Sequence, residues 1–130
     1  MVLVDTSIWI ELLNKKLSKT PSDDDLRKLC ICPPIVQEIL QGIAEPQIQA
    51  RLATTLLALE RVGDPLAMNT FLSAADIFST GRRKGLTIRS SFDCLIAAIA
   101  IENRIAVWHR DRDFTVIARF TSLKTVNGIE

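Results

Sequence analysis

The chain has 130 residues, 48% of them hydrophobic and 24% charged, which fits one domain with a packed core and argues against a disordered chain. The formal net charge of +1 excludes a highly basic tail or coat protein, and the single histidine excludes zinc and iron sites that need two. The longest unbroken apolar run, Cys94–Ile101, is far shorter than the roughly 18 residues of a membrane-spanning helix, so no membrane segment is expected.

In chain order, short apolar runs alternate with segments whose apolar residues recur at helical spacing. The wholly apolar start is typical of a strand buried on both faces, and Asp5 with the two hydroxyl residues after it can cap a helix. The polar segment Asn14–Asp25 ends in three aspartates and predicts a solvated loop or a helix start. The predicted elements are strands over Met1–Val4, Leu29–Cys32, Ile105–Trp108 and Leu123–Val126, and helices over Ile8–Leu13 and about Pro34–Ile43, Pro46–Arg61, Asn69–Lys84 and Phe92–Asn103.

Alternating strands and helices predict an α/β fold: a parallel sheet covered by helices on both sides, in a single domain over residues 1–130. The helix over Phe92–Asn103 is apolar nearly all round, so we expect it to be central and buried. Cys30, Cys32 and Cys94 are odd in number and sit among apolar residues, which indicates reduced, packed thiols in a cytoplasmic protein.

Three acidic side chains follow predicted strands. Asp5 ends the first strand, and Asp111 and Asp113 follow the strand over Ile105–Trp108. Ligands of open parallel sheets bind just beyond the carboxyl ends of the strands, so we expect these acids at one edge. A carboxylate beside so much apolar chain is costly unless a cation or hydrogen-bond donors compensate it. Taken alone, Asp5 could simply cap the following helix, and residues 110–113 could form a solvated turn.

Two further acids can reach this edge from helices. Asp93 lies in the first turn of the apolar helix, where a carboxylate also complements the helix dipole. On a wheel of about 100° per residue, Glu38 falls roughly 60° outside an apolar arc of roughly 140°, so it either leans around the core or is an ordinary boundary residue. Clustered carboxylates at neutral pH need raised pKa values or intervening cations. Mg²⁺ or Mn²⁺ suits such an all-carboxylate site.

Five motifs spread over the chain carry a resemblance to a known family. In order they are Val2-Leu3-Val4-Asp5-Thr6-Ser7, Val36-Gln37-Glu38-Ile39, Lys84-Gly85-Leu86-Thr87-Ile88, Asp93-Cys94-Leu95-Ile96-Ala97-Ala98 and His109-Arg110-Asp111-Arg112-Asp113-Phe114. This ordered set resembles the PIN-domain ribonucleases, and most of all the VapC-type toxins of bacterial and archaeal type II toxin–antitoxin systems. The resemblance implies a three-layer α/β/α PIN-like domain with a central, mainly parallel sheet.

The resemblance implies catalytic, metal-binding roles for the acids that these motifs carry: Asp5, Glu38, Asp93 and one acid of the last motif. Asp111 occupies the usual position of that last acid, and Asp113 is the neighbouring candidate. The family commonly has Thr or Ser two residues before it, where this chain has His109. His109 could donate to a carboxylate or a phosphate, or it could be purely structural.

The resemblance also implies an activity and partners. The expected reaction is Mg²⁺- or Mn²⁺-assisted hydrolysis of an RNA phosphodiester, with an in-line attack that leaves 5′-phosphate and 3′-hydroxyl ends. A cognate VapB-type antitoxin would cover the acidic pocket with an Arg-bearing segment, and a homodimer would form through helical faces. Six cations either hold the RNA backbone or belong to the solvated surface: Arg82, Arg83, Lys84, Arg89, Arg110 and Arg112.

Other functions are weighed against this one. A phosphoacceptor receiver domain is also an α/β binding module with an acidic pocket, but it needs a single phosphorylatable Asp at the end of a middle strand. A catalytically silent PIN-like interaction domain would keep the fold without the chemistry. An enzyme with a serine or cysteine nucleophile would need His109 as its base, without motif support such as GxSxG.

Overall fold

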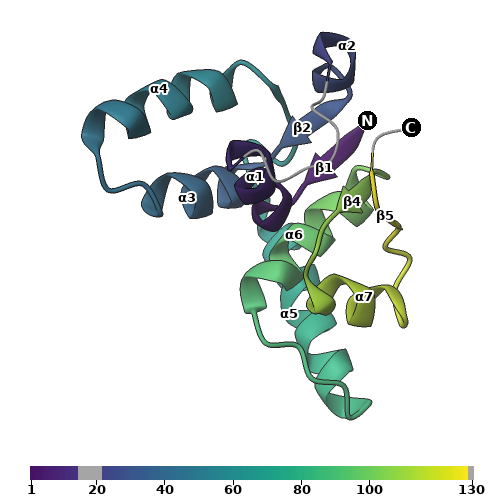
Figure 1. Ribbon diagram of the computed structural model, residues 1–130. Helices are drawn as coiled ribbons and strands as arrows, with labels where there is room; N and C mark the ends of the chain where they lie inside the picture. Colours follow the sequence, from purple (N-terminus) through teal and green to yellow (C-terminus); the bar gives the residue numbers. More distant parts are fainter. Residues whose placement is uncertain (15–21, 129–130) are drawn as a thin grey trace.

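The computed structural model describes residues 1–14 and 22–128 of the chain (Figure 1). One sheet has the strand order β3-β2-β1-β4-β5, and all four neighbouring pairs are parallel. The strands are β1 (Val2–Val4), β2 (Leu29–Ile31), β3 (Glu60–Arg61), β4 (Ala106–Trp108) and β5 (Thr125–Val126). The predicted parallel sheet is confirmed, and its central strand is the first one in the chain.

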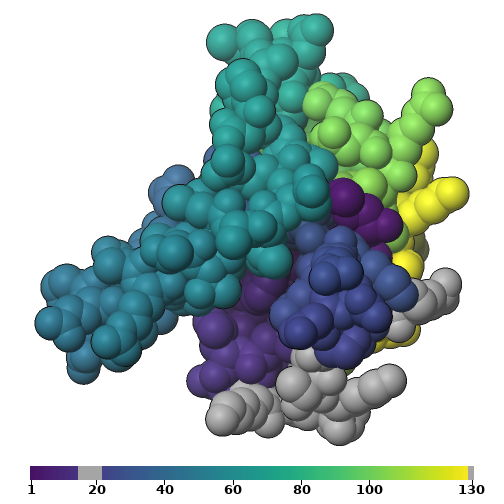
Figure 2. Space-filling view, turned by 90° about the horizontal axis from the view of Figure 1, so that it is seen from above, coloured from purple at the N-terminus to yellow at the C-terminus, as the bar shows by residue number. Residues whose placement is uncertain are grey.

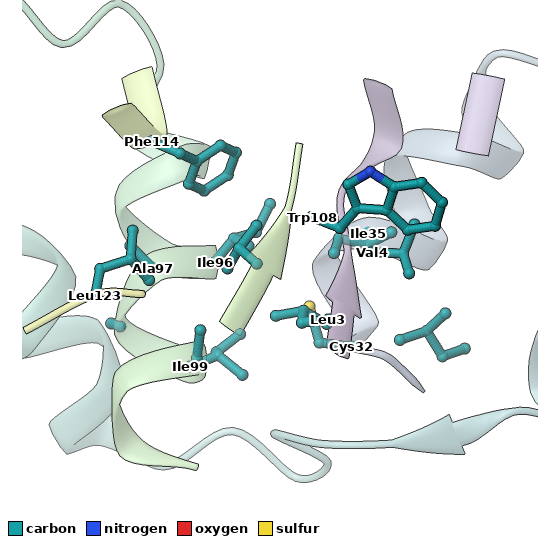
Figure 3. Close-up of a cluster of buried hydrophobic side chains, with 14 of the residues drawn as sticks. Leu3, Val4, Cys32, Ile35, Ile96, Ala97, Ile99, Trp108, Phe114 and Leu123 are labelled. Atoms are coloured by element: carbon teal, nitrogen blue, oxygen red, sulfur yellow. The ribbon is translucent and has the colours of Figure 1, made fainter. Parts of the chain in front are cut away.

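Helices cover both faces of the sheet, as predicted. They are α1 (Thr6–Leu13), α2 (Asp23–Leu26), α3 (Pro33–Gln41), α4 (Pro46–Leu57), α5 (Met68–Arg83), α6 (Ser91–Glu102) and α7 (Arg112–Ala118). Ile35 of α3 lies with Val4 and Trp108 on one side of the central strands, whereas Ile96 and Ile99 of α6 lie on the other (Figure 3). Among the described helices, none is long and apolar enough to cross a membrane.

The predicted polar loop over Asn14–Asp25 is described only in part, because residues 15–21 lie outside the described residues. Its end is a helix start, which was one of the two alternatives. The N–H of Asp25 donates to Ser22 Oγ (3.1 Å), and the N–H of Ser22 donates to Asp25 Oδ2 (3.0 Å). This reciprocal pair is a capping box, which satisfies backbone donors that a helix start leaves free.

Two elements differ from the prediction. The helix over Pro46–Arg61 is too long, because α4 ends at Leu57 and the last two residues pair with β2 as the edge strand β3. Both residues of β3 are polar and exposed, so they show no alternation that distinguishes a strand from a helix end. Helix α7 was not predicted, since its charged first turn is typical of a solvated loop. Asp111 caps this helix by accepting the N–H of Asp113.

The topology brings the ends of β1 and β4 together. Asp5 follows β1 and His109 follows β4, and the two strands are neighbours at the centre of the sheet. The N–H of Asp5 donates to the carbonyl of Trp108 (3.0 Å), so the pairing continues to this edge. From β1 the chain first adds β2 and β3 on one flank of β1 and later adds β4 and β5 on the other flank. The carboxyl ends of β1 and β4 therefore form the topological switch point at which α/β proteins bind ligands.

Candidate metal centre

Asp5 is held by the serine two residues after it. Its Oδ2 accepts the N–H of Ser7 (3.1 Å) and the Ser7 hydroxyl (2.6 Å), and it thereby caps α1. The same hydroxyl oxygen accepts the N–H of Arg110 (3.0 Å). Ser7 therefore joins the carboxylate after β1 to the loop after β4, and both functions expected of Asp5, helix cap and site acid, are compatible.

Asp113 and Asp111 have different surroundings. Asp113 is only 2% exposed, and its carboxylate accepts the N–H groups of Arg89 (3.0 Å to Oδ2) and Ser90 (2.9 Å). This carboxylate therefore ties the start of α7 to the start of α6, where the hydroxyl of Ser90 makes no capping bond. Asp111 accepts one amide, from Asp113 (2.9 Å), and its own N–H donates to Nδ1 of His109 (3.2 Å).

Asp93 is, like Asp113, a buried acid of the cluster. One carboxylate oxygen from each of Asp93, Asp111 and Asp113 lies within 4.8 Å of the others. Asp93 is 5% exposed, and its buried Oδ2 has no hydrogen-bond partner among the described residues. Burial raises the pKa of Asp93 to about 9, reinforced by the charges of Asp111 and Asp5 and by the hydrogen bonds that the protonated side chain can make with Asp111 and Asp113. A buried, unpartnered oxygen within an acidic cluster is the kind of atom that a cation would satisfy.

Glu38 and Asp5 complete the electrostatic site, although they lie outside this tightest group of three. Oε1 of Glu38 accepts the hydroxyl of Thr6 (2.9 Å), so α3 and α1 meet at the site. Burial raises the pKa of Glu38 despite this bond, and the charges of Asp5 and Asp111 raise it further. Burial likewise raises the pKa of Asp5, more than the bonds from Ser7 lower it. These oxygen-only donors fit a hard divalent cation.

The comparisons with known proteins decide the family. The family model described as "PIN domain" matches residues 2–120. The chain is 35% identical over 133 residues to "VapC ribonuclease Mb1587" of Mycobacterium bovis, with 98% of each chain covered, and equally to "Ribonuclease VapC11" of Mycobacterium tuberculosis. This chain belongs to the PIN-domain family and, within it, to the VapC ribonucleases.

Solved structures with the same fold include VapBC complexes. VapBC-1 from nontypeable Haemophilus influenzae superposes on the PIN domain with a TM-score of 0.73 at 18% identity, covering 97% of both chains. VapBC2 from Rickettsia felis, bound to a DNA fragment from its promoter, gives a TM-score of 0.73 at 21% identity, covering 97% of this chain and 98% of that chain. At these identities the likeness concerns the fold alone. The family resemblance is confirmed, and the receiver-like alternative is excluded.

The PIN domain brings together the acids that the sequence singled out. Besides burial, the charges of Asp5 and Asp111 raise the pKa of both Glu38 and Asp93, so these two acids lie between the others electrostatically, and Asp113 belongs to the tightest group with Asp93 and Asp111. Sequence reasoning missed what holds them. The capping signal of Thr6 and Ser7 was visible, but their bonds to Glu38 and to the loop after β4 follow only from the fold.

The six candidate cations fall into two places. Arg82, Arg83 and Lys84 lie at the C-terminal end of α5, where Arg82 stacks over Phe78 (4.9 Å) and Arg83 lies 3.9 Å from an oxygen of Asp76. The other three, Arg89, Arg110 and Arg112, belong to segments that border the acidic cluster. All three are exposed, and Nε of Arg110 lies 3.3 Å from Oε1 of Glu11.

The raised pKa of Asp93 makes the stability of the metal-free PIN domain depend on pH. Because the folded-state pKa lies above the ordinary 3.8, the unfolded chain gives up this proton first, and the free energy of unfolding falls as pH rises from about 4 towards 9. Asp93→Asn removes this contribution. In EDTA at pH 8 we expect Asp93→Asn to melt at a higher temperature than wild type. The difference between the two melting temperatures should become smaller towards pH 4.

The control is Asp24→Asn, which changes an exposed acid of α2 at the opposite edge of the sheet. We expect its melting temperature to follow wild type at every pH. A gap between Asp93→Asn and wild type that is the same at pH 4 and pH 8 would show that Asp93 ionises normally in the folded protein.

Proposed function

We propose that this PIN domain is the toxin of a toxin–antitoxin pair and acts as a Mg²⁺- or Mn²⁺-dependent endoribonuclease. The observation that carries the metal dependence is the buried, unpartnered Oδ2 of Asp93, set in a cluster with Asp111 and Asp113. The donor set contains only carboxylate oxygens and lies at the switch point of the sheet. The ribonuclease assignment draws on the names of the relatives that are 35% identical.

In the proposed mechanism, Asp5, Glu38, Asp93 and Asp111 hold the cation. When bound, Mg²⁺ or Mn²⁺ lowers the pKa of a water molecule and neutralises charge on the phosphate oxygens. Asp111 is the better fourth ligand, because Asp113 already accepts two backbone amides while Asp111 accepts one. The hydroxyl of Ser7 fixes the orientation of the Asp5 carboxylate. In-line attack by water on the phosphodiester would leave 5′-phosphate and 3′-hydroxyl ends.

Removing a ligand should abolish cleavage without unfolding the protein. We expect Asp93→Asn and Asp5→Asn to slow Mg²⁺-dependent cleavage of cellular RNA by about 100-fold or more, since a catalytic cation contributes several kcal/mol at about 1.4 kcal/mol per tenfold. EDTA should stop the wild-type reaction, and excess Mg²⁺ should restore it. The rate is measured by gel electrophoresis, and sequencing of the new ends identifies the bond that is cut.

Asp24→Asn is again the matched control and should cut at the wild-type rate. Full activity of purified Asp93→Asn would refute the proposed metal centre. If wild type binds Mn²⁺ but leaves RNA intact, the non-catalytic PIN-like interaction domain is the correct interpretation.

We also propose that Arg89 and Arg112 bind the RNA backbone at the site, with Arg82, Arg83, Lys84 and Arg110 as the other candidates. Arg89 lies two residues before α6 and Arg112 is the first residue of α7, so both exposed residues start beside the acidic cluster. Arg110 is the weaker candidate, because it already pairs with Glu11.

Replacing these arginines should weaken RNA binding more than catalysis. We expect Arg89→Ala and Arg112→Ala to raise KM severalfold. Each substitution should also reduce the slope of log KM against log salt concentration by about 0.7. This is the value for single-stranded RNA when the protein neutralises one phosphate fewer. Arg27→Ala, at the C-cap of α2 and near the amino ends of the strands, should leave KM unchanged. Equal effects of all three substitutions would show that no local contact with RNA exists.

We further propose two protein partners: a VapB-type antitoxin that covers the acidic pocket and a second copy of this chain. The arm formed by α3 and α4 projects from the body of the molecule (Figure 2). Large exposed apolar side chains on three helices support such contacts: Ile10, Leu13, Ile48, Leu57, Met68, Phe71 and Leu72. Light scattering should give twice the 14.5 kDa chain mass for the protein alone. A monomer at micromolar concentration would refute the dimer.

We propose that the protein is cytoplasmic, because its cysteines are free thiols. Cys30, Cys32 and Cys94 are free and buried, and burial raises the pKa of the Cys32 thiol to about 12. Such thiols are unreactive packing groups, as in proteins of a reducing compartment. A Cys30–Cys32 disulfide found by mass spectrometry of the cellular protein would contradict this location.

A further inference from the structure

The loop between β4 and α7 is held by three consecutive side-chain-to-backbone contacts. Nδ1 of His109 accepts the N–H of Asp111 (3.2 Å), and Oδ1 of Asp111 accepts the N–H of Asp113 (2.9 Å). The carboxylate of Asp113 in turn accepts the N–H groups of Arg89 and Ser90. Each contact fixes the backbone that carries the next acid, and His109 is the first member of the series.

The ring of His109 is itself held in place. It packs against Phe114 of α7, with ring centroids 5.1 Å apart and planes tilted by 47°. Phe114 is completely buried, so it offers a fixed surface. One face contact and one hydrogen bond together define both the position and the rotation of the imidazole.

We infer that His109 is a positioning residue that orients the metal ligand Asp111 through the hydrogen bond from the Asp111 amide to Nδ1. This inference rests on the proposed function, since it concerns the metal that Asp111 would bind. An Nδ1 that accepts a backbone N–H leaves the ring proton on Nε2. Nδ1 is therefore occupied and unavailable to take a proton from an attacking water, which argues against a general-base role for that atom.

Two substitutions separate the hydrogen bond from the ring packing. His109→Asn keeps an acceptor that can reach the amide two residues ahead, as asparagine does in tight turns, but removes the ring. His109→Phe keeps a ring against Phe114 but removes the acceptor. His109→Ala removes both. The measurement is the affinity of each purified protein for Mn²⁺, followed by the electron paramagnetic resonance signal of the free ion, together with its melting temperature in EDTA.

We expect His109→Asn to bind Mn²⁺ nearly as tightly as wild type. His109→Phe and His109→Ala should bind it about 10-fold more weakly or worse, which is the usual cost of losing a group that orients a metal ligand. Weak binding by the Asn variant with normal binding by the Phe variant would assign His109 to packing and overturn the inference. Equal affinities across all three variants, whether high or low, would also overturn it. Asp93→Asn is the separate check: if it binds Mn²⁺ like wild type, the proposed metal centre itself is wrong, whatever the His109 variants do.

Discussion

The main constraint on this structure is the repulsion among the carboxylates that lie at the carboxyl ends of the central strands. Parallel strands deliver Asp5 and Asp111 to one place, and helices add Glu38 and Asp93. Hydrogen bonds from Thr6 and Ser7 stabilise the charged forms, but burial outweighs them, and the pKa values of Asp5 and Glu38 rise. Asp5, Glu38, Asp111 and Asp113 each accept at least one hydrogen bond, whereas the buried Oδ2 of Asp93 accepts none from the described residues.

Much of this could be predicted from the sequence, because burial leaves a strong signal. The apolar runs of β1, β2 and β4 and the wholly apolar α6 have no stable place outside a covered sheet. Edge strand β3 left no such signal, since Glu60 and Arg61 are exposed and continue the spacing of the helix before them. Helix α7 was hidden for a related reason: its charged start is stabilised by a cap and by a partner about 24 residues earlier in the chain, which local patterns do not contain.

The candidate site shows the same division. The acids were identifiable because each interrupts or borders apolar chain, but their different tasks were not. The family motif favours Asp111 over Asp113 without giving a reason, and only the fold places two backbone amides before α6 against Asp113 while Asp111 stays more open. In the same way, His109 differs from the hydroxyl residue that the family commonly has, yet its ring nitrogen accepts a backbone amide, as a hydroxyl oxygen also can.

The place of β1 at the middle of the sheet has a consequence for synthesis. β1 is made about 100 residues before β4, its partner on one side, so its two flanks cannot both be filled until residues 106–108 have left the ribosome. The acids are spread in the same way, from position 5 to position 111. A nascent chain therefore cannot assemble the acidic cluster before the segment that carries Asp111 has left the ribosome.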